Sequence, residues 1–389
     1  MRAAAITNLT AAVIKDLRPN NVVNEEGFKA LISYLEPGYH LPSATHFTNL
    51  IEKMYTTAKE QIHHLFSEVK YVSITGDIWT SIATHAYLTI AVHYLNLEWE
   101  MKSLSLGTIL LDDSHTAGRL LEEELGWATI GCAGHTLQLC VNSGLKINRK
   151  VVQAISASRK LATHFRKSEP AMRALRIWES DMKVPSHNLI HDVSMRWNST
   201  YYMIDCLFEQ RWPITAVLSD STVTKSSDKC LDLKSKQWDI LEPLQVILGP
   251  LEVATTYPSA EYNLLISALL PVLFGLIKLL ETLDSDTSTI RQAKVEISSQ
   301  IQRRWNLNNL LIAKDNFYLM SSFLDPTLNN CKFLNTHPKM EVTLLLIQLL
   351  TEIKESNLPH SSSEEIGSSA SNTVFVIISF RYSFRNVRK

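Results

Sequence analysis

The stretch that decides the fold is YVSITGDIWTS, from Tyr71 to Ser81. Its first part, Tyr71 to Thr75, alternates and is rich in β-branched residues, which is typical of a strand. Tyr87–Leu95 and Leu104–Leu111 have the same character and follow after short connections. Three consecutive strands joined in this way predict an antiparallel meander. Asp77 comes where the first strand is expected to end, so its carboxylate either points into a cleft or caps the next turn.

Helical periodicity surrounds these strands on both sides. We expect helices at residues 28–35, 46–69, 115–125, 136–145, 151–165, 169–179, 197–218, 235–255, 263–283, 287–306 and 339–355. Pro213 is expected to kink the helix over 197–218. The very apolar stretch Leu264–Leu280 is slightly short for a membrane span and carries Pro271 and Lys278, so it predicts a buried core helix.

The composition is that of a soluble globular protein. Of the 389 residues, 45% are hydrophobic and 20% are charged, and the net charge is −1. Because there is no basic excess, contact with nucleic acid would have to come from a local patch. Five cysteines without a Cys-x-x-Cys pair argue against a disulfide framework and favour a reducing compartment.

Six short motifs occur in order along the chain. They are Asp16-Leu17-Arg18-Pro19, Ile74 to Ser81, Ser114 to Ala117, Cys132 to Leu137, Asp192-Val193 with Arg196 to Thr200, and Phe323 to Pro326. Together they resemble the hAT transposase family, in the group whose members carry an N-terminal BED zinc finger. The resemblance runs from about residue 10 to about residue 350.

This resemblance implies an α/β fold plus an all-α part: an incomplete RNase H-like core with a large helical region. The domains expected from it are an N-terminal helical region (1–70), the core remnant (71–150), a helical region (151–355) and a Ser-rich disordered tail (356–389). In the family, three carboxylates hold two divalent metal ions that activate the attacking group and stabilise the leaving oxygen.

The resemblance matches only the first of these acids, Asp77, which we interpret as vestigial. The second acid is expected between residues 125 and 131, which contain no Asp, Glu or Asn. Glu122 to Glu124 just upstream read as a solvated helix face, and Asp113 as a helix cap. The third acid is expected beyond Phe323–Pro326, where only Glu364 and Glu365 of the Ser-rich tail remain. We therefore predict no enzymatic activity and no cofactor, with Mg²⁺ or Mn²⁺ bound only if an intact metal site exists.

The family gives DNA contacts to the positions of His135, Arg196 and Trp197. Arg can pair with phosphate in bidentate fashion, and Trp offers a face for an unpaired base. The alternatives are a packed helix for Cys132 and His135, and a core Trp197 with Arg196 at the surface. Cys132 and His135 alone make no zinc site, because zinc takes four ligands, or three and a water molecule.

The resemblance also sets expectations for location and partners. Residues 1–60 contain no Cys, so no BED finger is expected there, and the family's C-terminal dimerisation region is not matched. We expect a nuclear, transposase-derived protein that binds DNA or partner proteins and does not associate with membranes. The sequence does not fix its oligomeric state. Two alternatives stay open: an active DDE-type nuclease, and a decayed transposon product without a selected function.

Overall fold

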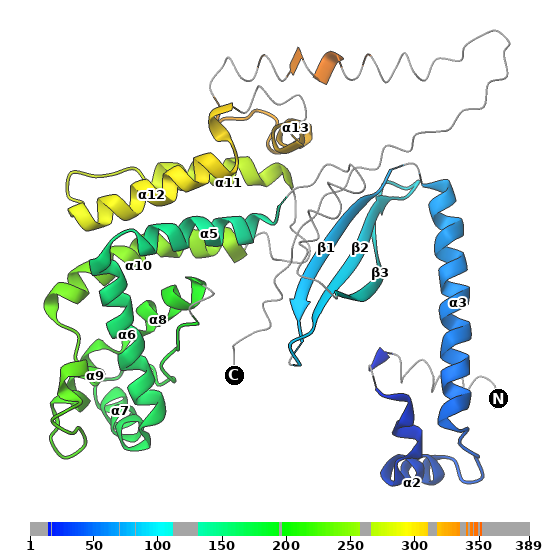
Figure 1. Ribbon diagram of the computed structural model, residues 1–389, viewed down its shortest axis with the longest axis horizontal. Coiled ribbons are helices and arrows are strands. Elements are labelled where there is room, and N and C mark those ends of the chain that lie inside the picture. The colour runs from blue at the N-terminus through cyan, green and yellow to red at the C-terminus, as the bar shows by residue number, and fades with distance from the viewer. Residues whose placement is uncertain are drawn as a thin grey trace. The chain divides into compact units, whose positions relative to one another are not determined.

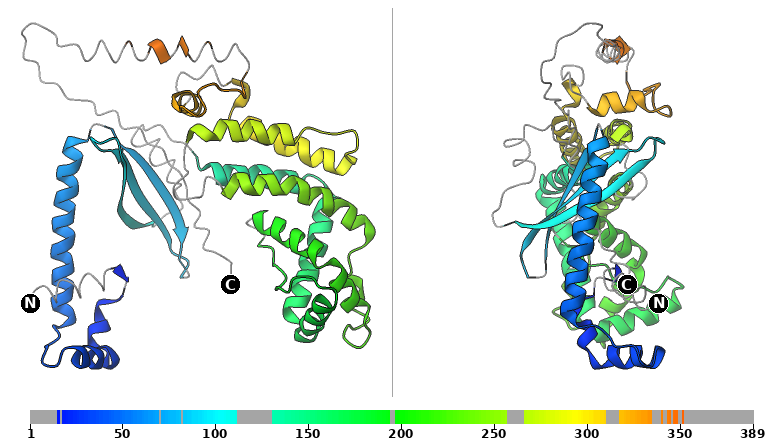
Figure 2. Two further views of the ribbon diagram at one scale, coloured as in Figure 1. Left: turned by 180° about the vertical axis from the view of Figure 1, so that it is seen from behind. Right: turned by 90° about the vertical axis from the view of Figure 1, so that its right-hand side faces the viewer.

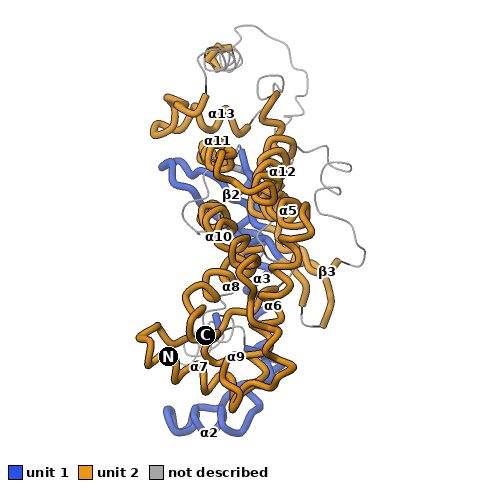
Figure 3. The backbone as a smooth tube through the Cα atoms, turned by 90° about the vertical axis from the view of Figure 1, so that its left-hand side faces the viewer, with its two compact units in different colours: residues 1–74, 91–107, 369–376 blue, residues 75–90, 108–368, 377–389 orange. Residues whose placement is uncertain are grey.

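The computed structural model describes residues 15–16, 18–69, 71–81, 83–111, 131–193, 197–256, 266–309 and 317–334, with isolated residues between 340 and 351. These residues divide into two compact units (Figure 3). One unit takes in the described parts of 1–74 and 91–107, and the other those of 75–90 and 108–368. The predicted helices at 115–125 and 339–355, the tail 356–389 and Arg196 lie wholly or mostly outside the described residues.

The N-terminal helices are η1 (Asn20–Asn24), α2 (Glu26–Leu35) and α3 (Ala44–Glu68) (Figure 1). Ser43 caps α3 by accepting a hydrogen bond from the backbone N–H of His46 at 3.3 Å. The 3-10 helix η1 packs against α3, and Val23 of η1 and Phe47 of α3 are buried, at 1% and 0% exposure. The predicted helices at 28–35 and 46–69 are therefore confirmed.

A three-stranded antiparallel sheet follows, with β1 (Ser73–Thr80), β2 (Ala86–Leu95) and β3 (Met101–Leu111) in the order β1-β2-β3. A tight turn joins β2 to β3, with the Asn96 N–H donating to the Glu100 carbonyl at 3.0 Å. Cross-strand contacts include Trp79 stacked on Tyr87 at 4.7 Å between ring centroids. The predicted meander is confirmed, whereas the RNase H-like arrangement of a larger core stays a prediction, as do the four domain boundaries.

Nine helices of eight residues or more make up the described part of the chain after the sheet. They are α5 (Ala133–Lys146), α6 (Arg149–Lys167), α7 (Glu169–Asp181), α8 (Trp197–Glu209), α9 (Arg211–Ser219), α10 (Ser235–Thr256), α11 (Leu269–Leu279), α12 (Ser288–Arg304) and α13 (Phe317–Leu324). Short 3-10 turns are η2 (Lys229–Leu231), η4 (Ile266–Ala268) and η5 (Leu307–Asn309). These helices share one apolar core, with Phe165, Met203, Leu244 and Ile297 each at 0% exposure.

The single kinked helix predicted over 197–218 is wrong, because the chain forms two helices that meet at Gln210. Gln210 is buried and its side-chain amide donates to the carbonyl of Pro185 at 2.7 Å, which holds the junction to the preceding loop. Pro213 then falls in the first turn of α9, where a missing backbone N–H costs nothing.

The apolar stretch predicted to be a core helix contains α11, which buries Leu270, Leu273 and Leu276. None of the helices in the described ranges has both the length and the apolar character that crossing a membrane requires.

Candidate functional site

The Cys132–His135 motif forms the N-terminal end of α5. The Cys132 sulfur accepts a hydrogen bond from the backbone N–H of His135 at 3.5 Å, and the Thr136 hydroxyl donates to the Cys132 carbonyl at 2.9 Å. Burial raises the pKa of the Cys132 thiol, and the nearby Asp77 carboxylate adds to this effect. Cys132 therefore acts as a protonated helix cap, which is neither a good metal ligand nor a good nucleophile.

His135 lies close to the C-terminal end of α12. Burial lowers the pKa of its imidazole, and the positive charge of Arg304 lowers this pKa further. The ring is consequently neutral at pH 7 and can act as a hydrogen-bond donor. In the ranges that the structure describes, no group of three or more His, Cys, Asp or Glu side chains is placed to hold a metal ion.

Helices α5 and α12 lie side by side and antiparallel (Figures 1 and 2). Asn148, after the end of α5, donates to Gln292 near the start of α12 at 2.8 Å. At the opposite end of the pair, Arg304 influences the pKa values of both His135 and Cys140. This pairing brings the Cys-x-x-His motif to a basic helix end that is far away in sequence.

A polar relay along the α5–α12 contact orients two arginines. The Ser143 hydroxyl and the Gln300 amide both donate to the Glu296 carboxylate, at 2.5 and 2.9 Å. The Gln300 oxygen in turn accepts from Arg303 at 2.8 Å and from Arg304 at 3.2 Å. Both guanidinium groups are exposed, so their remaining N–H groups are open to an anion.

We call His135, Arg303 and Arg304 the cationic end. Two guanidinium groups held by one amide oxygen have lost part of their rotamer freedom before a ligand arrives. Arginine forks match the geometry of phosphate oxygens, and a neutral imidazole can add a further hydrogen bond. Sequence reasoning missed Arg303 and Arg304, although two adjacent basic residues at the end of the predicted helix 287–306 were the available signal.

Asp77 lies inside β1 rather than at the end of a strand, because the strand continues to Thr80. The prediction of a strand-terminal acid is therefore wrong. The strand is longer because Trp79 also takes part in the sheet, with its indole N–H donating to Thr89 at 3.1 Å. The electrostatic effect of Asp77 on Cys132 nevertheless places the predicted first acid near the Cys-x-x-His motif.

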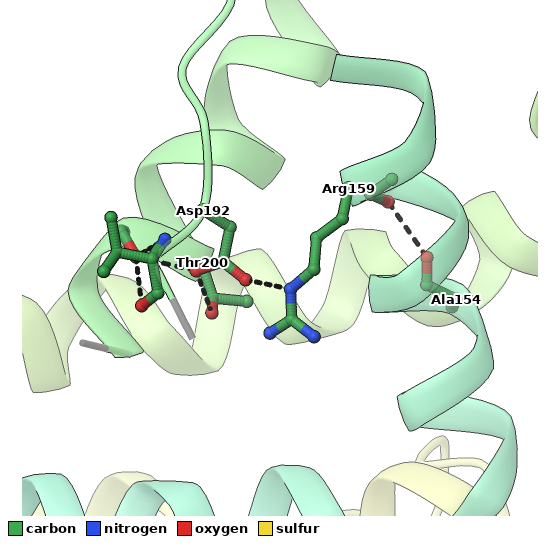
Figure 4. Close-up of polar contacts among 7 residues, drawn as sticks. Ala154, Arg159, Asp192 and Thr200 are labelled. Carbon is green, nitrogen blue, oxygen red and sulfur yellow. Dashed lines mark hydrogen bonds and ion pairs between the residues drawn. The ribbon is translucent and has the colours of Figure 1, made fainter. Parts of the chain in front are cut away.

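Asp192 of the Asp192–Thr200 motif has a buried side chain that joins three elements (Figure 4). Its carboxylate accepts hydrogen bonds from Arg159 of α6, from the Ser199 hydroxyl at 2.6 Å and from the Thr200 hydroxyl at 3.0 Å. The backbone N–H of Val193 donates to the Ser199 hydroxyl at 2.7 Å. These hydrogen bonds thus hold Asp192 and Val193 to the first turn of α8, and Asp192 also to α6.

Trp197 belongs to the core of the helical unit, with 1% of its surface exposed. An indole buried to this extent offers no face to a nucleic-acid base, so the alternative of a core tryptophan describes this structure. A base-stacking role for Trp197 would require the first turn of α8 to open. Arg196 falls outside the described residues, and its DNA contact stays a prediction.

Among known proteins, a family model matches part of the helical region, and individual relatives match most of the chain. A family model named ZBED1 RNase-like helical domain matches residues 130–246, which contain both the Cys-x-x-His and the Asp192–Thr200 motifs. Zinc finger BED domain-containing protein 4 of Homo sapiens is 25% identical, over 94% of this chain and 34% of the relative. The Putative AC9 transposase of Zea mays is 22% identical, over 83% of this chain and 46% of the relative.

The chain is homologous to hAT transposases and BED-finger proteins. A further relative, zinc finger BED domain-containing protein 6 of Mus musculus, is 24% identical over 84% of the chain and 38% of the relative. The chain spans between a third and a half of the length of these three relatives. Of the cationic end, His135 lies at the start of the matched region 130–246, whereas Arg303 and Arg304 lie beyond its end.

Proposed function

We propose that this protein is a transposase-derived, nuclear DNA-binding protein that does not cleave DNA. The observation that carries the proposal is the cationic end, where Gln300 holds both Arg303 and Arg304 and the charge of Arg304 acts on His135. Such a site suits the phosphate backbone, because guanidinium groups bind phosphate oxygens in bidentate fashion. Homology to transposases makes DNA the expected polyanion, and the nucleus the expected location.

The absence of cleavage is proposed from the acids that two-metal chemistry requires. Three carboxylates must hold the two ions, and Asp77 is the one acid that the family resemblance matches. The segment from residue 125 to 131, where the second acid is expected, contains no Asp or Glu. A single carboxylate cannot hold two metal ions, and the loss of members of a catalytic set removes most of the activity. Mg²⁺ or Mn²⁺ would matter only if a substitute acid completes the site.

The DNA-binding half is tested with the full chain and a fluorescent duplex, titrated at 50 and at 200 mM salt. Replacing Arg303 and Arg304 by Gln should reduce the slope of log K against log salt by about 1.8. The loss of affinity between about 50 and 200 mM salt should therefore be about 12-fold smaller than in wild type. The control replaces the exposed Arg173 and Arg176 of α7 by Gln, with the same change in charge. Equal effects of the two variants, or wild-type protein that does not bind, would contradict the proposal.

The catalytic half is tested by incubating hairpin and duplex DNA with wild type and Asp77→Asn in Mg²⁺ or Mn²⁺. We expect no strand cleavage by either protein. Cleavage by wild type that disappears in Asp77→Asn would establish the alternative of an active nuclease. A wild-type chain that neither binds nor cleaves DNA would favour a decayed transposon product.

A further inference from the structure

Helix α6 concentrates positive charge in a chain that is almost neutral overall. Its sequence RKVVQAISASRKLATHFRK, from Arg149 to Lys167, contains six Lys or Arg and no Asp or Glu. The net charge of the whole chain is −1, so this helix is locally far from the average composition. A local patch of this kind is what electrostatic binding to a polyanion requires.

The helix separates an apolar face from a basic face. The buried residues are Val151, Ala154, Ile155, Ser158, Leu161, Ala162 and Phe165. On the opposite face, Arg149, Lys160 and Lys167 are separated by eleven and by seven residues, close to three and two helical turns. They therefore lie on one line along the helix, about 27 Å long at 1.5 Å per residue. We call these three residues the basic stripe.

Within the described residues, no carboxylate forms an ion pair with the basic stripe. Arg159 is neutralised by the buried Asp192, but it is set to one side of the stripe. Arg149, Lys160 and Lys167 are exposed and, within the described ranges, form no ion pair with a carboxylate. Lys150 and Arg166 are also exposed and flank the stripe, while Gln153 adds a neutral donor between Arg149 and Lys160.

We propose that the basic stripe of α6 binds the phosphate backbone of duplex DNA without reading its sequence. This inference rests on the proposed function and adds a second contact surface to the cationic end. Duplex DNA carries about one negative charge per 1.7 Å of its axis, so a 27 Å row of cations faces phosphates along its whole length. A membrane surface is the poorer fit, because an interfacial helix inserts its apolar face and α6 buries that face in the core.

The test measures binding of the full chain to duplexes of unrelated sequence by fluorescence anisotropy between 50 and 200 mM salt. The stripe variant carries Arg149→Gln, Lys160→Gln and Lys167→Gln. The slope of log K against log salt should fall by about 2.7 in this variant. Its loss of affinity between about 50 and 200 mM salt should therefore be about 40-fold smaller than the loss shown by wild type. The loss should be the same for every duplex, because phosphate contacts carry no sequence information.

The control variant carries Lys225→Gln, Lys234→Gln and Lys236→Gln, which remove three exposed charges elsewhere in the same unit. It should keep the wild-type slope, and both variants should keep the wild-type unfolding midpoint. A stripe variant that binds like wild type, or a control that loses as much, would overturn the stripe while leaving the cationic end intact. Wild-type protein that does not bind any duplex would overturn the proposed function and the stripe together. Binding by the stripe to anionic vesicles or acidic peptides but not to DNA would likewise overturn it.

Discussion

Gly144 of α5 lies directly against Ile297 of α12: a Cβ atom at position 144 would be 2.3 Å from the Ile297 Cγ1 atom and 3.0 Å from the Ala293 carbonyl oxygen. This absence of a side chain lets the two helices approach closely enough for the Ser143–Glu296 relay to form. The position of the cationic end therefore depends on one glycine in the last turn of α5.

Gly144→Ala should lower the free energy of unfolding by about 1–3 kcal/mol, because the added methyl group overpacks the helix contact. Chemical denaturation of the full chain measures the change. Gly275→Ala in α11 is the matched control, since its Cβ atom would meet nothing within 4 Å. That control should gain about 0.5–1 kcal/mol from helix propensity. Equal stability of Gly144→Ala and wild type would contradict the close approach.

Asp192→Ala should destabilise the helical unit by about 3 kcal/mol, because one buried carboxylate accepts hydrogen bonds from Arg159, Ser199 and Thr200. The cost is at the lower end of the range for buried ion pairs because the Arg159 side chain is 37% exposed and can be hydrated again. Urea unfolding measures it, with Asp181→Ala at the exposed end of α7 as control. Similar midpoints for the two variants would argue against the clamp.

Trp197→Ala should cost about 3–5 kcal/mol of stability, because it removes a large side chain that is 1% exposed. Any loss of DNA binding in this variant would then follow from unfolding rather than from a missing stacking platform. Trp212→Ala is the control, since Trp212 is 66% exposed and packs against Arg211. It should cost less than about 1 kcal/mol. A Trp197→Ala protein as stable as wild type would show that this residue is not part of the core.

The relay predicts a pH dependence through Glu296. Hydrogen bonds from Ser143 and Gln300 lower the pKa of its carboxyl below 4.5 in the folded state. A lowered folded-state pKa contributes stability that is fully present above the unfolded value of 4.5 and is lost as the pH falls through the folded pKa. The stability difference between wild type and Glu296→Gln should therefore be largest near pH 7 and shrink below pH 4.5. Denaturant unfolding between pH 3 and 7 measures it, and a pH-independent difference would refute the relay.

Most of the secondary structure could be predicted because it depends on local pattern. Alternating β-branched residues marked the strands of 71–111, and apolar residues at helical spacing marked α5, α6, α7, α10 and α12. The errors are at junctions, such as the break at Gln210, where a long-range hydrogen bond to Pro185 decides where a helix ends. The extension of β1 past Asp77 likewise depends on a partner strand that local sequence does not specify.

The candidate site was predictable only in part. The sequence by itself determined that a Cys-x-x-His motif starts a helix, that one acid precedes it and that an Asp192–Thr200 motif follows, because these are short patterns along the chain. Tertiary structure alone decided that Arg304 lies beside His135, that Asp192 binds Arg159 and that Trp197 is buried. The physical reason is that helix periodicity shows which face is apolar but not which helix covers it. The pairing of α5 with α12, across some 150 residues of sequence, is set by packing complementarity at Gly144 and Ile297.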